Sequence, residues 1–321
     1  HCGPKLEQLD WLDPYARVTV RLAASVSRLC QFMSLRHVAA FYGLAWSTVK
    51  LIDHRCLERR LGPPCLEGVE VIAMDEFAIQ KGHRYATVIV EPYRKRVLWV
   101  GRGRGRLDVR PFFELLGPQG RRAIKAVCMD MSGAYTEEVR FQCPAAEIVY
   151  DLFHVLAKYG REVIDRVRVD EANRLRHDRP ARHLIKGSRW LLLRNRDNLT
   201  TDAERVRLRE LLAANRALLT VYLMKDELKA LWSYRHFGYA QRFWQQWLWR
   251  AMHSRIEALK HFARNLKPLV PGILAHCRWP LGTNLIEGIN NKIKVIKRMA
   301  YGFRDDAYFF LKIRAAFPGN R

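Results

Sequence analysis

The sequence predicts a mixed α/β fold with a helical domain in front of it and a long all-helical insertion within it. Residues 66–154 read as three strands, a helix, a strand, a helix and a strand, an order that is typical of α/β proteins. From about residue 155 to 280 the strand signal disappears, and leucine-rich helical patterns take its place. The chain of 321 residues is long enough for two or three compact units.

Residues 17–62 show helical periodicity and the pattern of a helix-turn-helix domain. In SLRHVAAFYGLAWSTVKLIDHR, Ala39, Gly43 and Val49 stand where such a motif needs a small residue, a turn and a β-branched residue. The second helix would begin near Ala45. Its side chains that would face DNA are Ser47, Thr48, Lys50 and His54. An ordinary helical hairpin is the alternative.

The segment LGPPCLEG, residues 61–68, is typical of a linker between this domain and the α/β core. Three strand-like runs follow, and the short breaks between them predict an antiparallel meander. The expected strands are 69–74, 85–90, 96–100, 123–130 and 146–151, and the expected helices between the last three are 109–117 and 133–142.

The last part of the chain, residues 281–321, returns to the core with a long amphipathic helix. Four isoleucines and an alanine step by three and four residues, so they form one apolar stripe that packs on another element. They are Ile286, Ile289, Ile293, Ile296 and Ala300. We therefore expect the helical insertion, residues 155–280, to separate two parts of a single core.

The chain is strongly basic, because 56 Lys and Arg against 32 Asp and Glu give a formal net charge of +24. This excess points to a polyanion, either nucleic acid or an anionic membrane surface. No run reaches the ~18 apolar residues of a membrane span, so we expect double-stranded DNA and no membrane. Seven scattered cysteines without a CxxC pair favour reduced thiols in a cytoplasm.

Two apolar runs end at a carboxylate, Asp75 in VIAMDEFAIQ and Asp130 in VCMDMSGAY. If the two strands are neighbours, these like charges need a cation between them. Mg²⁺ or Mn²⁺ takes oxygen ligands, and two such ions ~4 Å apart can activate a water or a 3′-hydroxyl and hold the leaving oxygen of a phosphodiester. Glu287, beside the isoleucine stripe, is the strongest third acid. Its competitors are Asp151, Asp305 and Asp306.

Each of these acids also has an ordinary structural explanation. Asp75 could cap a turn, Asp130 could cap the following helix, and Glu287 could be a solvated helical residue. The cations that follow Glu287 favour the metal site, because an acid at the head of a basic helical face suits a site that opens onto phosphates. The cations, which we expect to contact DNA, are Lys292, Lys294, Lys297 and Arg298. GRGRGR, residues 101–106, either contacts phosphate or forms a solvated turn.

Three tryptophans lie close together in the insertion, in RFWQQWLWR. Trp244 and Trp247 are three residues apart and share a helical face, whereas Trp249 points elsewhere. We expect all three to be buried, because large aromatic side chains usually lie in the core. The alternative is that one of them stacks on an unpaired base.

Four segments resemble the motifs of bacterial DDE transposases of the ISL3 insertion-sequence family: VIAMDEFAIQKGHRYATVIVE, IKAVCMDMSGAY, YDLFHV and NLIEGINNKIKVIKRMAYGFRD. The resemblance covers nearly the whole chain from the helix-turn-helix onward. It implies an RNase H-like catalytic core interrupted by a helical insertion before the final glutamate. It carries the catalytic and metal-binding roles onto Asp75, Asp130 and Glu287.

The segment DLFH also resembles an acid-x-x-His element of several transposase superfamilies. On this chain that element is Asp151 and His154, which would support the active site or form a buried structural pair. Family members usually begin with a cysteine-rich zinc-binding ribbon, of which residues 1–16 retain only HCG. Zn²⁺ is therefore expected only if a missing ribbon is present.

The resemblance implies a transposase that binds terminal inverted repeats, cuts there with two Mg²⁺ or Mn²⁺ ions and joins the freed 3′ ends to target DNA. Its synaptic complex would hold at least two copies of the chain, at the nucleoid in a bacterial cytoplasm. Two alternatives remain open. One is a non-catalytic DNA-binding regulator derived from a transposase, and the other is an RNase H-like structure-selective nuclease.

Overall fold

The computed structural model describes residues 9–14, 16–80, 82–281 and 284–319. The chain forms two compact units, the first from residues 1–124 and 284–321 and the second from residues 125–283. Strands and helices occur in both units, so the mixed α/β prediction is confirmed. The metal-binding remnant predicted within residues 1–16 lies mostly outside the described residues. No described helix has the length and apolar character needed to cross a membrane.

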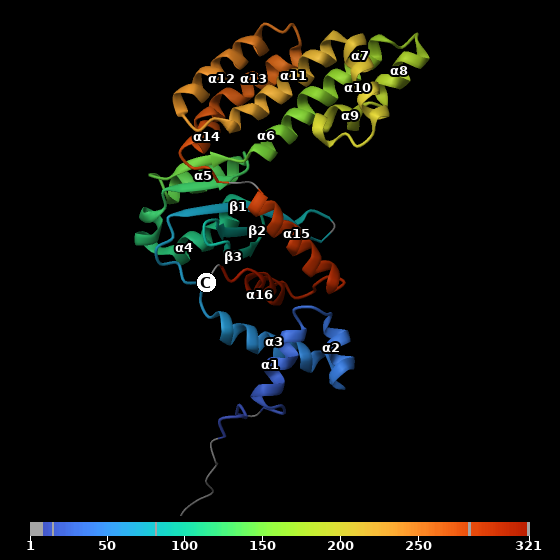
Figure 1. Ribbon diagram of the computed structural model, residues 1–321. Coiled ribbons are helices and arrows are strands. Elements are labelled where there is room, and N and C mark those ends of the chain that lie inside the picture. Colours follow the sequence, from blue (N-terminus) through green and yellow to red (C-terminus); the bar gives the residue numbers. More distant parts are fainter. Residues whose placement is uncertain (1–8, 15, 81, 282–283, 320–321) are drawn as a thin grey trace, which may run out of the picture. The chain divides into compact units, whose positions relative to one another are not determined.

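The first unit begins with a three-helix domain, formed by α1 (Val20–Leu29), α2 (Leu35–Tyr42) and α3 (Trp46–Leu61) (Figure 1). Gly43 ends α2 in the left-handed conformation, with φ 65°, which glycine adopts without a steric penalty. Ala39 and Val49 are buried in the small core of this domain. The turn, the small residue and the β-branched residue of the predicted motif are therefore confirmed.

Three antiparallel strands form the sheet of the first unit, in the order β3-β2-β1. They are β1 (Val71–Gln80), β2 (Arg84–Glu91) and β3 (Arg96–Arg102), so the predicted meander is confirmed. The prediction that Asp75 ends its strand is wrong. β1 continues past it because Phe77 and Ala78 still pair with β2, opposite Ala86 and Tyr85.

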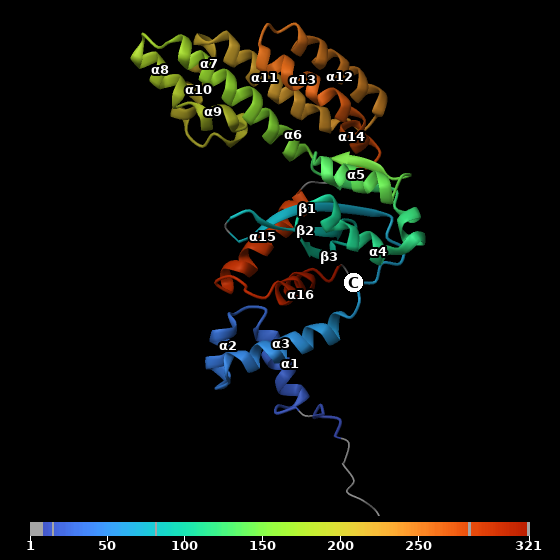
Figure 2. The ribbon, with the colours of Figure 1, turned by 180° about the vertical axis from the view of Figure 1, so that it is seen from behind.

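Three further helices complete the first unit: α4 (Arg106–Ala123), α15 (Asn284–Met299) and α16 (Asp306–Ala316). α4 is longer than the predicted helix at 109–117 and is kinked at Gly117. The four isoleucines of the predicted stripe are buried, and α15 packs against β1. α16 contacts β3 on one side and α3 on the other, as Figures 1 and 2 both show.

The second unit starts with two parallel strands, β4 (Ala126–Met129) and β5 (Glu147–Tyr150), joined by α5 (Gly133–Gln142). Beyond β5 every described element up to residue 281 is helical, as predicted for residues 155–280 (Figure 2). A π-helical turn (Gly160–Ile164) and short 3₁₀ turns link these helices. The helices are α6 (Leu152–Tyr159), α7 (Asp165–Arg174), α8 (Arg179–Lys186), α9 (Arg189–Leu193), α10 (Asp202–Ala214), α11 (Arg216–Ala230), α12 (Phe237–Met252), α13 (Glu257–Leu266) and α14 (Val270–Leu274).

The tryptophans of α12 divide between core and surface. Trp244 and Trp247 are buried and stacked, with ring centroids 5.3 Å apart, and the Trp247 indole donates a hydrogen bond to the Met224 carbonyl at 2.9 Å. Trp249 is 63% exposed and stacks on His253 instead. The expectation that all three are core residues is wrong for Trp249. It follows Trp247 by two residues, so its side chain does not lie on the buried face of the helix.

Candidate catalytic and DNA-binding sites

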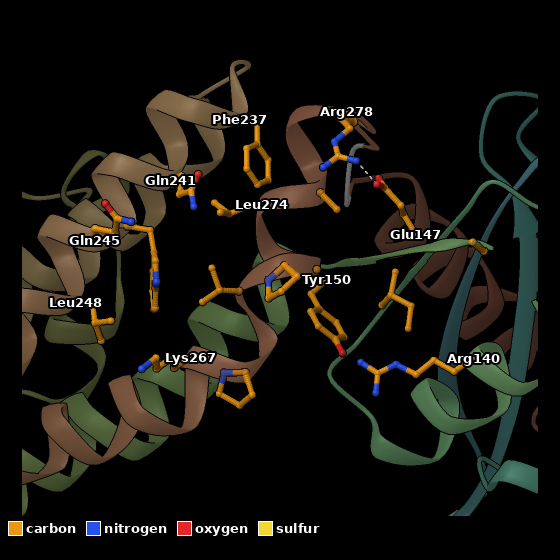
Figure 3. Close-up of a pocket in the computed structure, with 18 of the residues that line it drawn as sticks. Arg140, Glu147, Tyr150, Phe237, Gln241, Gln245, Leu248, Lys267, Leu274 and Arg278 are labelled. Carbon is orange, nitrogen blue, oxygen red and sulfur yellow. Dashed lines mark hydrogen bonds and ion pairs between the residues drawn. The ribbon is translucent and has the colours of Figure 1, made fainter. Parts of the chain in front are cut away.

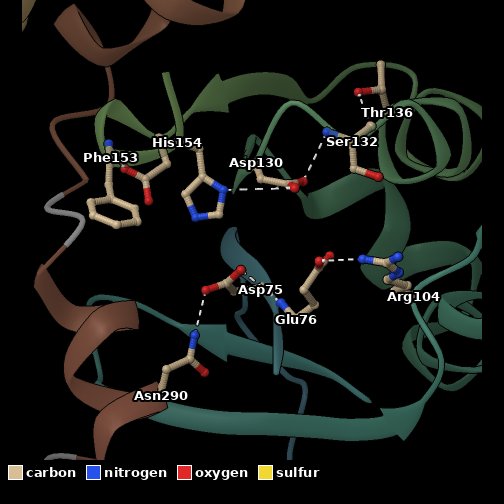
Figure 4. A network of polar contacts seen from close by, with 10 residues as sticks. Asp75, Glu76, Arg104, Asp130, Ser132, Thr136, Phe153, His154 and Asn290 are labelled. Carbon is tan, nitrogen blue, oxygen red and sulfur yellow. Dashed lines mark hydrogen bonds and ion pairs between the residues drawn. The ribbon is translucent and has the colours of Figure 1, made fainter. Parts of the chain in front are cut away.

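Two neighbouring acids of β1 have separate partners, because successive side chains of a strand point to opposite faces. Asp75 Oδ1 accepts a hydrogen bond from the Glu76 backbone N–H at 2.8 Å, and Asp75 Oδ2 accepts one from Asn290 Nδ2 at 2.6 Å (Figure 4). The Glu76 carboxylate instead pairs with Arg104 at 3.0 Å. Asp75 is therefore the acid of β1 that faces α15.

Two hydrogen bonds fix how α15 lies along β1. Asn290 meets Asp75, and Lys297 Nζ donates to the Ala78 carbonyl at 2.9 Å. Seven helical residues and three strand residues each advance ~10 Å, so helix and strand run side by side in the same direction. Glu287 is exposed in the first turn of α15, one turn before Asn290. Its carboxylate thus lies within one helical turn of the residue that holds Asp75.

The oxygen atoms around Asp75 suit a hard divalent cation. Within the described residues, no three or more His, Cys, Asp and Glu side chains are already grouped as a metal site. Asp75 on β1 and Glu287 on α15 would supply carboxylates to such an ion. Asn290 adds an amide oxygen, Oδ1, which is buried and has no hydrogen-bond partner. Carboxylate and amide oxygens are the ligands that such ions prefer, so the residues of the first unit fit Mg²⁺ or Mn²⁺.

Asp130, in the second unit, directly follows β4, as predicted. Its Oδ1 accepts a hydrogen bond from the Ser132 backbone N–H at 3.0 Å, and its Oδ2 lies 3.9 Å from His154 Nδ1 (Figure 4). Asp151 caps α6 by accepting the Phe153 backbone N–H at 2.8 Å. The two residues of DLFH thus have different surroundings: Asp151 begins a helix and His154 faces Asp130.

Two of the four α3 residues predicted to contact DNA are engaged by the C-terminal part of the chain. Lys50 Nζ lies 2.7 Å from Asp305 Oδ2, and this hydrogen bond is the main reason that the pKa of Asp305 is lowered. The His54 ring stacks on Tyr308, and its Nδ1 lies 3.1 Å from Glu58. Both partners, Asp305 and Tyr308, lie at the start of α16.

The other side of α3 is open to solvent. Ser47, Leu51 and Arg55 are four residues apart, so they form one stripe along the helix, and all three are exposed, Leu51 to 50%. Thr48 is half-buried beside them. Ser47 and Thr48 were among the predicted DNA contacts, whereas Leu51 and Arg55 were not, although their spacing from Ser47 could have indicated them.

A buried polar network holds the helix-turn-helix against α16. Asp53 on α3 is fully buried and accepts hydrogen bonds from Ser27 on α1 at 2.7 Å and from Lys312 on α16 at 3.1 Å. The Tyr308 hydroxyl donates to Asp53 Oδ2, the oxygen that also accepts from Lys312, whereas Ser27 donates to Oδ1. Burial, followed by the charge of Asp53, raises the pKa of Tyr308 well above its ordinary range. Lys312 also donates a hydrogen bond to the Cys30 carbonyl, so its buried ammonium group has two partners inside the protein.

The two predicted basic segments differ in how far their cations are engaged. On α15, Lys292, Lys294 and Arg298 are exposed, whereas Lys297 is bound to β1. In GRGRGR, Arg102 pairs with Asp306 at 2.5 Å. Arg104 lies over the Tyr85 ring, 4.1 Å from its centroid, in addition to its pairing with Glu76. GRGRGR is therefore tied to the first unit by its arginines and is not a free loop.

The second unit contains a cavity of ≈ 690 Å³ between α12 and α14 on one side and α5 and β5 on the other (Figure 3). Apolar and aromatic side chains of both sides line it, together with the amides of Gln241 and Gln245. Its lining cations are Arg140, Lys267 and Arg278. Glu147, at the same cavity, pairs with Arg278 and accepts the Trp279 indole N–H at 2.8 Å. The lining cations therefore outnumber the single lining acid.

Comparisons with known proteins agree with the resemblance seen in the sequence. A family model of ISL3-type DDE proteins, described as "Transposase", matches residues 72–313, and the helix-turn-helix domain of transposase family ISL3 matches residues 7–57. The chain is 58% identical over 318 residues to the transposase for insertion sequence element IS1001 of Bordetella parapertussis, covering 99% of this chain and 78% of that protein. It is 26% identical over 343 residues to the transposase for insertion sequence element IS1557 of Mycobacterium tuberculosis, covering 99% of this chain and 76% of that protein.

Proposed function

Because this chain belongs to the ISL3 family of DDE transposases and is an insertion-sequence transposase, we propose that Asp75, Asp130 and Glu287 are its catalytic acids. The observation that carries the proposal is the hydrogen bond between Asp75 and α15, the helix that bears Glu287. Asp130 is supported by its position directly after β4 and by the facing His154. All three would belong to one RNase H-like core, with the helices after β5 as its insertion.

A pair of divalent ions bound by these acids would activate the attacking water or 3′-hydroxyl and stabilise the leaving oxygen of a phosphodiester. The residues around the acids hold the carboxylates in position. Asp75 is oriented by two hydrogen bonds before any ligand arrives, so little reorganisation is needed to bind a cation. His154 supports Asp130 by limiting the positions of its carboxylate, and Asp151 supports His154 by starting the helix on which it lies.

The DNA partner follows from the helix-turn-helix domain and the basic helix. We propose that the stripe of Ser47, Leu51 and Arg55 reads base edges in the terminal inverted repeats, where Arg pairs with guanine and Leu contacts a thymine methyl. The exposed cations of α15 would contact the phosphate backbone next to Glu287. The site of action would be DNA in the bacterial cytoplasm, with at least two copies of the chain in the synaptic complex.

The decisive experiment incubates the purified chain with a DNA fragment that ends in a terminal repeat, a target plasmid and Mg²⁺, and follows both cleavage and strand transfer. We expect nicking at the repeat and joined products, both lost in EDTA. Asp130→Asn and Glu287→Gln should each abolish both products and retain DNA binding.

The same assay separates the two alternatives. A regulator derived from a transposase would bind the repeat and give no product with any divalent ion. A structure-selective nuclease would cleave but never join the 3′ end to the target. Either outcome, obtained with a chain that binds the repeat, would contradict the proposed function.

A further inference from the structure

Asn290 places a polar side chain within the apolar face of α15. It lies between Ile289 and Ile293, both buried, and its Nδ2 is 2.6 Å from Asp75 Oδ2. The next residue, Asn291, is exposed, and its Oδ1 accepts a hydrogen bond from Lys294 Nζ at 3.3 Å. Two neighbouring asparagines therefore have different surroundings, one at a catalytic acid and the other at the surface.

The orientation of the Asn290 amide follows from its partner. An ionised carboxylate only accepts hydrogen bonds, so the amide nitrogen must point to Asp75. The amide oxygen Oδ1 is then left buried without a hydrogen-bond partner. A buried acceptor that has lost its hydration and gained no donor is unfavourable, so such an atom in a native site calls for an explanation.

Attachment of α15 to β1 accounts for the amide nitrogen but not for the unpaired amide oxygen. The buried isoleucines already pack the helix on its neighbours, and Lys297 bonds to the Ala78 carbonyl further along β1. A leucine at position 290 would extend the apolar face and leave no unpaired oxygen. The asparagine is better explained by a ligand that is bound through Oδ1.

We propose that Asn290 both positions a metal ligand and is a metal ligand itself: its amide N–H group holds the Asp75 carboxylate, and its Oδ1 completes the coordination of the divalent cation that Asp75 and Glu287 bind. This inference rests on the proposed catalytic site. An amide oxygen is a suitable ligand for a hard cation, and a hydrogen bond to a ligating carboxylate fixes that ligand's orientation. The three oxygen donors come from only two elements, β1 and α15.

The test measures Mn²⁺ binding to the DNA-free full chain by the rise in melting temperature, so its readout does not depend on activity. Asn290→Leu removes both the donor and the oxygen, and Asn291→Leu is the matched control one residue away. We expect Asn290→Leu to need about 10- to 100-fold more Mn²⁺ for half of the full rise. Asn291→Leu should titrate like the original chain.

Asn290→Asp provides a second, opposite signal. It puts another carboxylate where an amide lies 2.6 Å from Asp75. Two ionised carboxylates at that distance repel each other unless a cation lies between them. This variant should therefore melt at a lower temperature than the original chain in EDTA, and Mn²⁺ should raise its melting temperature by more. Asn291→Asp, at the exposed position, should show neither change.

The outcomes separate this inference from the proposed function. If Asp75→Asn loses the Mn²⁺ response but Asn290→Leu keeps the original midpoint, Asn290 has no role at the metal and only the inference is wrong. If Asp75→Asn also keeps the full response, the cation does not bind at Asp75 and the proposed catalytic site is wrong. A lower melting temperature of Asn290→Leu in EDTA with an unchanged Mn²⁺ midpoint would mean a packing role alone, and would also overturn the inference.

Discussion

Asp75 and Glu76 are adjacent in the chain but differ in the function that we expect of them. Asp75→Asn removes a charge that would bind the catalytic cation, so cleavage should fall below detection, while DNA affinity stays the same or rises with the loss of a negative charge. Glu76→Gln, on the opposite face of β1 and paired with Arg104, should retain cleavage. Gel-shift and plasmid-nicking assays on both variants check this. A parallel loss of binding and cleavage in Asp75→Asn would count against a purely catalytic role.

At this scale the sequence allowed the three acids to be proposed, because each stands beside an apolar run or stripe. Asn290 could have been proposed too, since an amide between two isoleucines of the apolar stripe is itself a signal. Lys50 and His54 were assigned to DNA because their partners could not be foreseen. Asp305 is 255 residues away from Lys50 in the chain, and only the packing of α16 on α3 brings it to 2.7 Å.

Among the elements, the contact between α3 and α16 depends on a buried ion pair. Lys312→Met should destabilise the chain by about 3–5 kcal/mol, because it leaves the fully buried Asp53 carboxylate without its cation. Adding Asp53→Asn should recover part of that loss, since the remaining groups are then neutral. Urea unfolding of the single and double variants measures both effects. Equal stability of Lys312→Met and the original chain would mean that the pair contributes nothing.

The exposed stripe of α3 predicts which residues determine DNA specificity. Arg55→Ala and Leu51→Ala should each weaken binding to the terminal repeat by about 1–3 kcal/mol and leave binding to unrelated DNA nearly unchanged. Lys50→Ala should instead act on the contact with Asp305 and leave the preference for the repeat intact. Competition between repeat and scrambled duplexes measures this preference. If only Lys50→Ala lost the preference for the repeat, Lys50 would contact the DNA bases as the sequence predicted, and the exposed stripe would not.

The tryptophans of α12 test which face of that helix is structural. Trp247→Ala should cost about 3–5 kcal/mol, because it empties a buried site and removes the hydrogen bond to Met224. Trp249→Ala should change the melting temperature little, since its ring is mostly exposed. If Trp249 stacks on an unpaired base, its alanine variant should process the second strand more slowly at unchanged stability. If Trp249→Ala processed the second strand at the normal rate, Trp249 would have no role in base stacking.

Element order was the most predictable part of the fold. Strand alternation and helical periodicity are local, so the meander, the helix-turn-helix and the helical character of residues 155–280 could be predicted. The end of β1 could not, because the continuation of the strand past Asp75 depends on cross-strand pairing of Phe77 with Ala86 rather than on the local pattern. The exposure of Trp249 was not predicted because large aromatic residues are usually buried. Its position on the helix, away from the face of Trp244 and Trp247, exposes it instead.

For the whole molecule, the net charge of +24 predicts strongly salt-dependent DNA binding. Each phosphate contact contributes ~0.9 to the slope of log affinity against log salt, so contacts to six or more phosphates would lower affinity about 10³-fold or more between about 50 and about 200 mM salt. Not every cation contributes equally. Arg59 and Lys260 are already paired with Asp13 and Glu257, at 2.6 and 2.7 Å.

Lys292 and Lys294 are exposed on the basic face of α15, and their charges are available to phosphates. The double variant Lys292→Ala/Lys294→Ala should therefore lower the salt slope by about 2 and weaken binding to all sequences alike. Arg59→Ala/Lys260→Ala removes the same number of charges, but its slope should change little because those charges are neutralised within the protein. Affinities measured across a salt series give both slopes. Equal slopes for the two double variants would mean that DNA does not follow the basic face of α15, and that the excess charge acts only through the field of the whole protein.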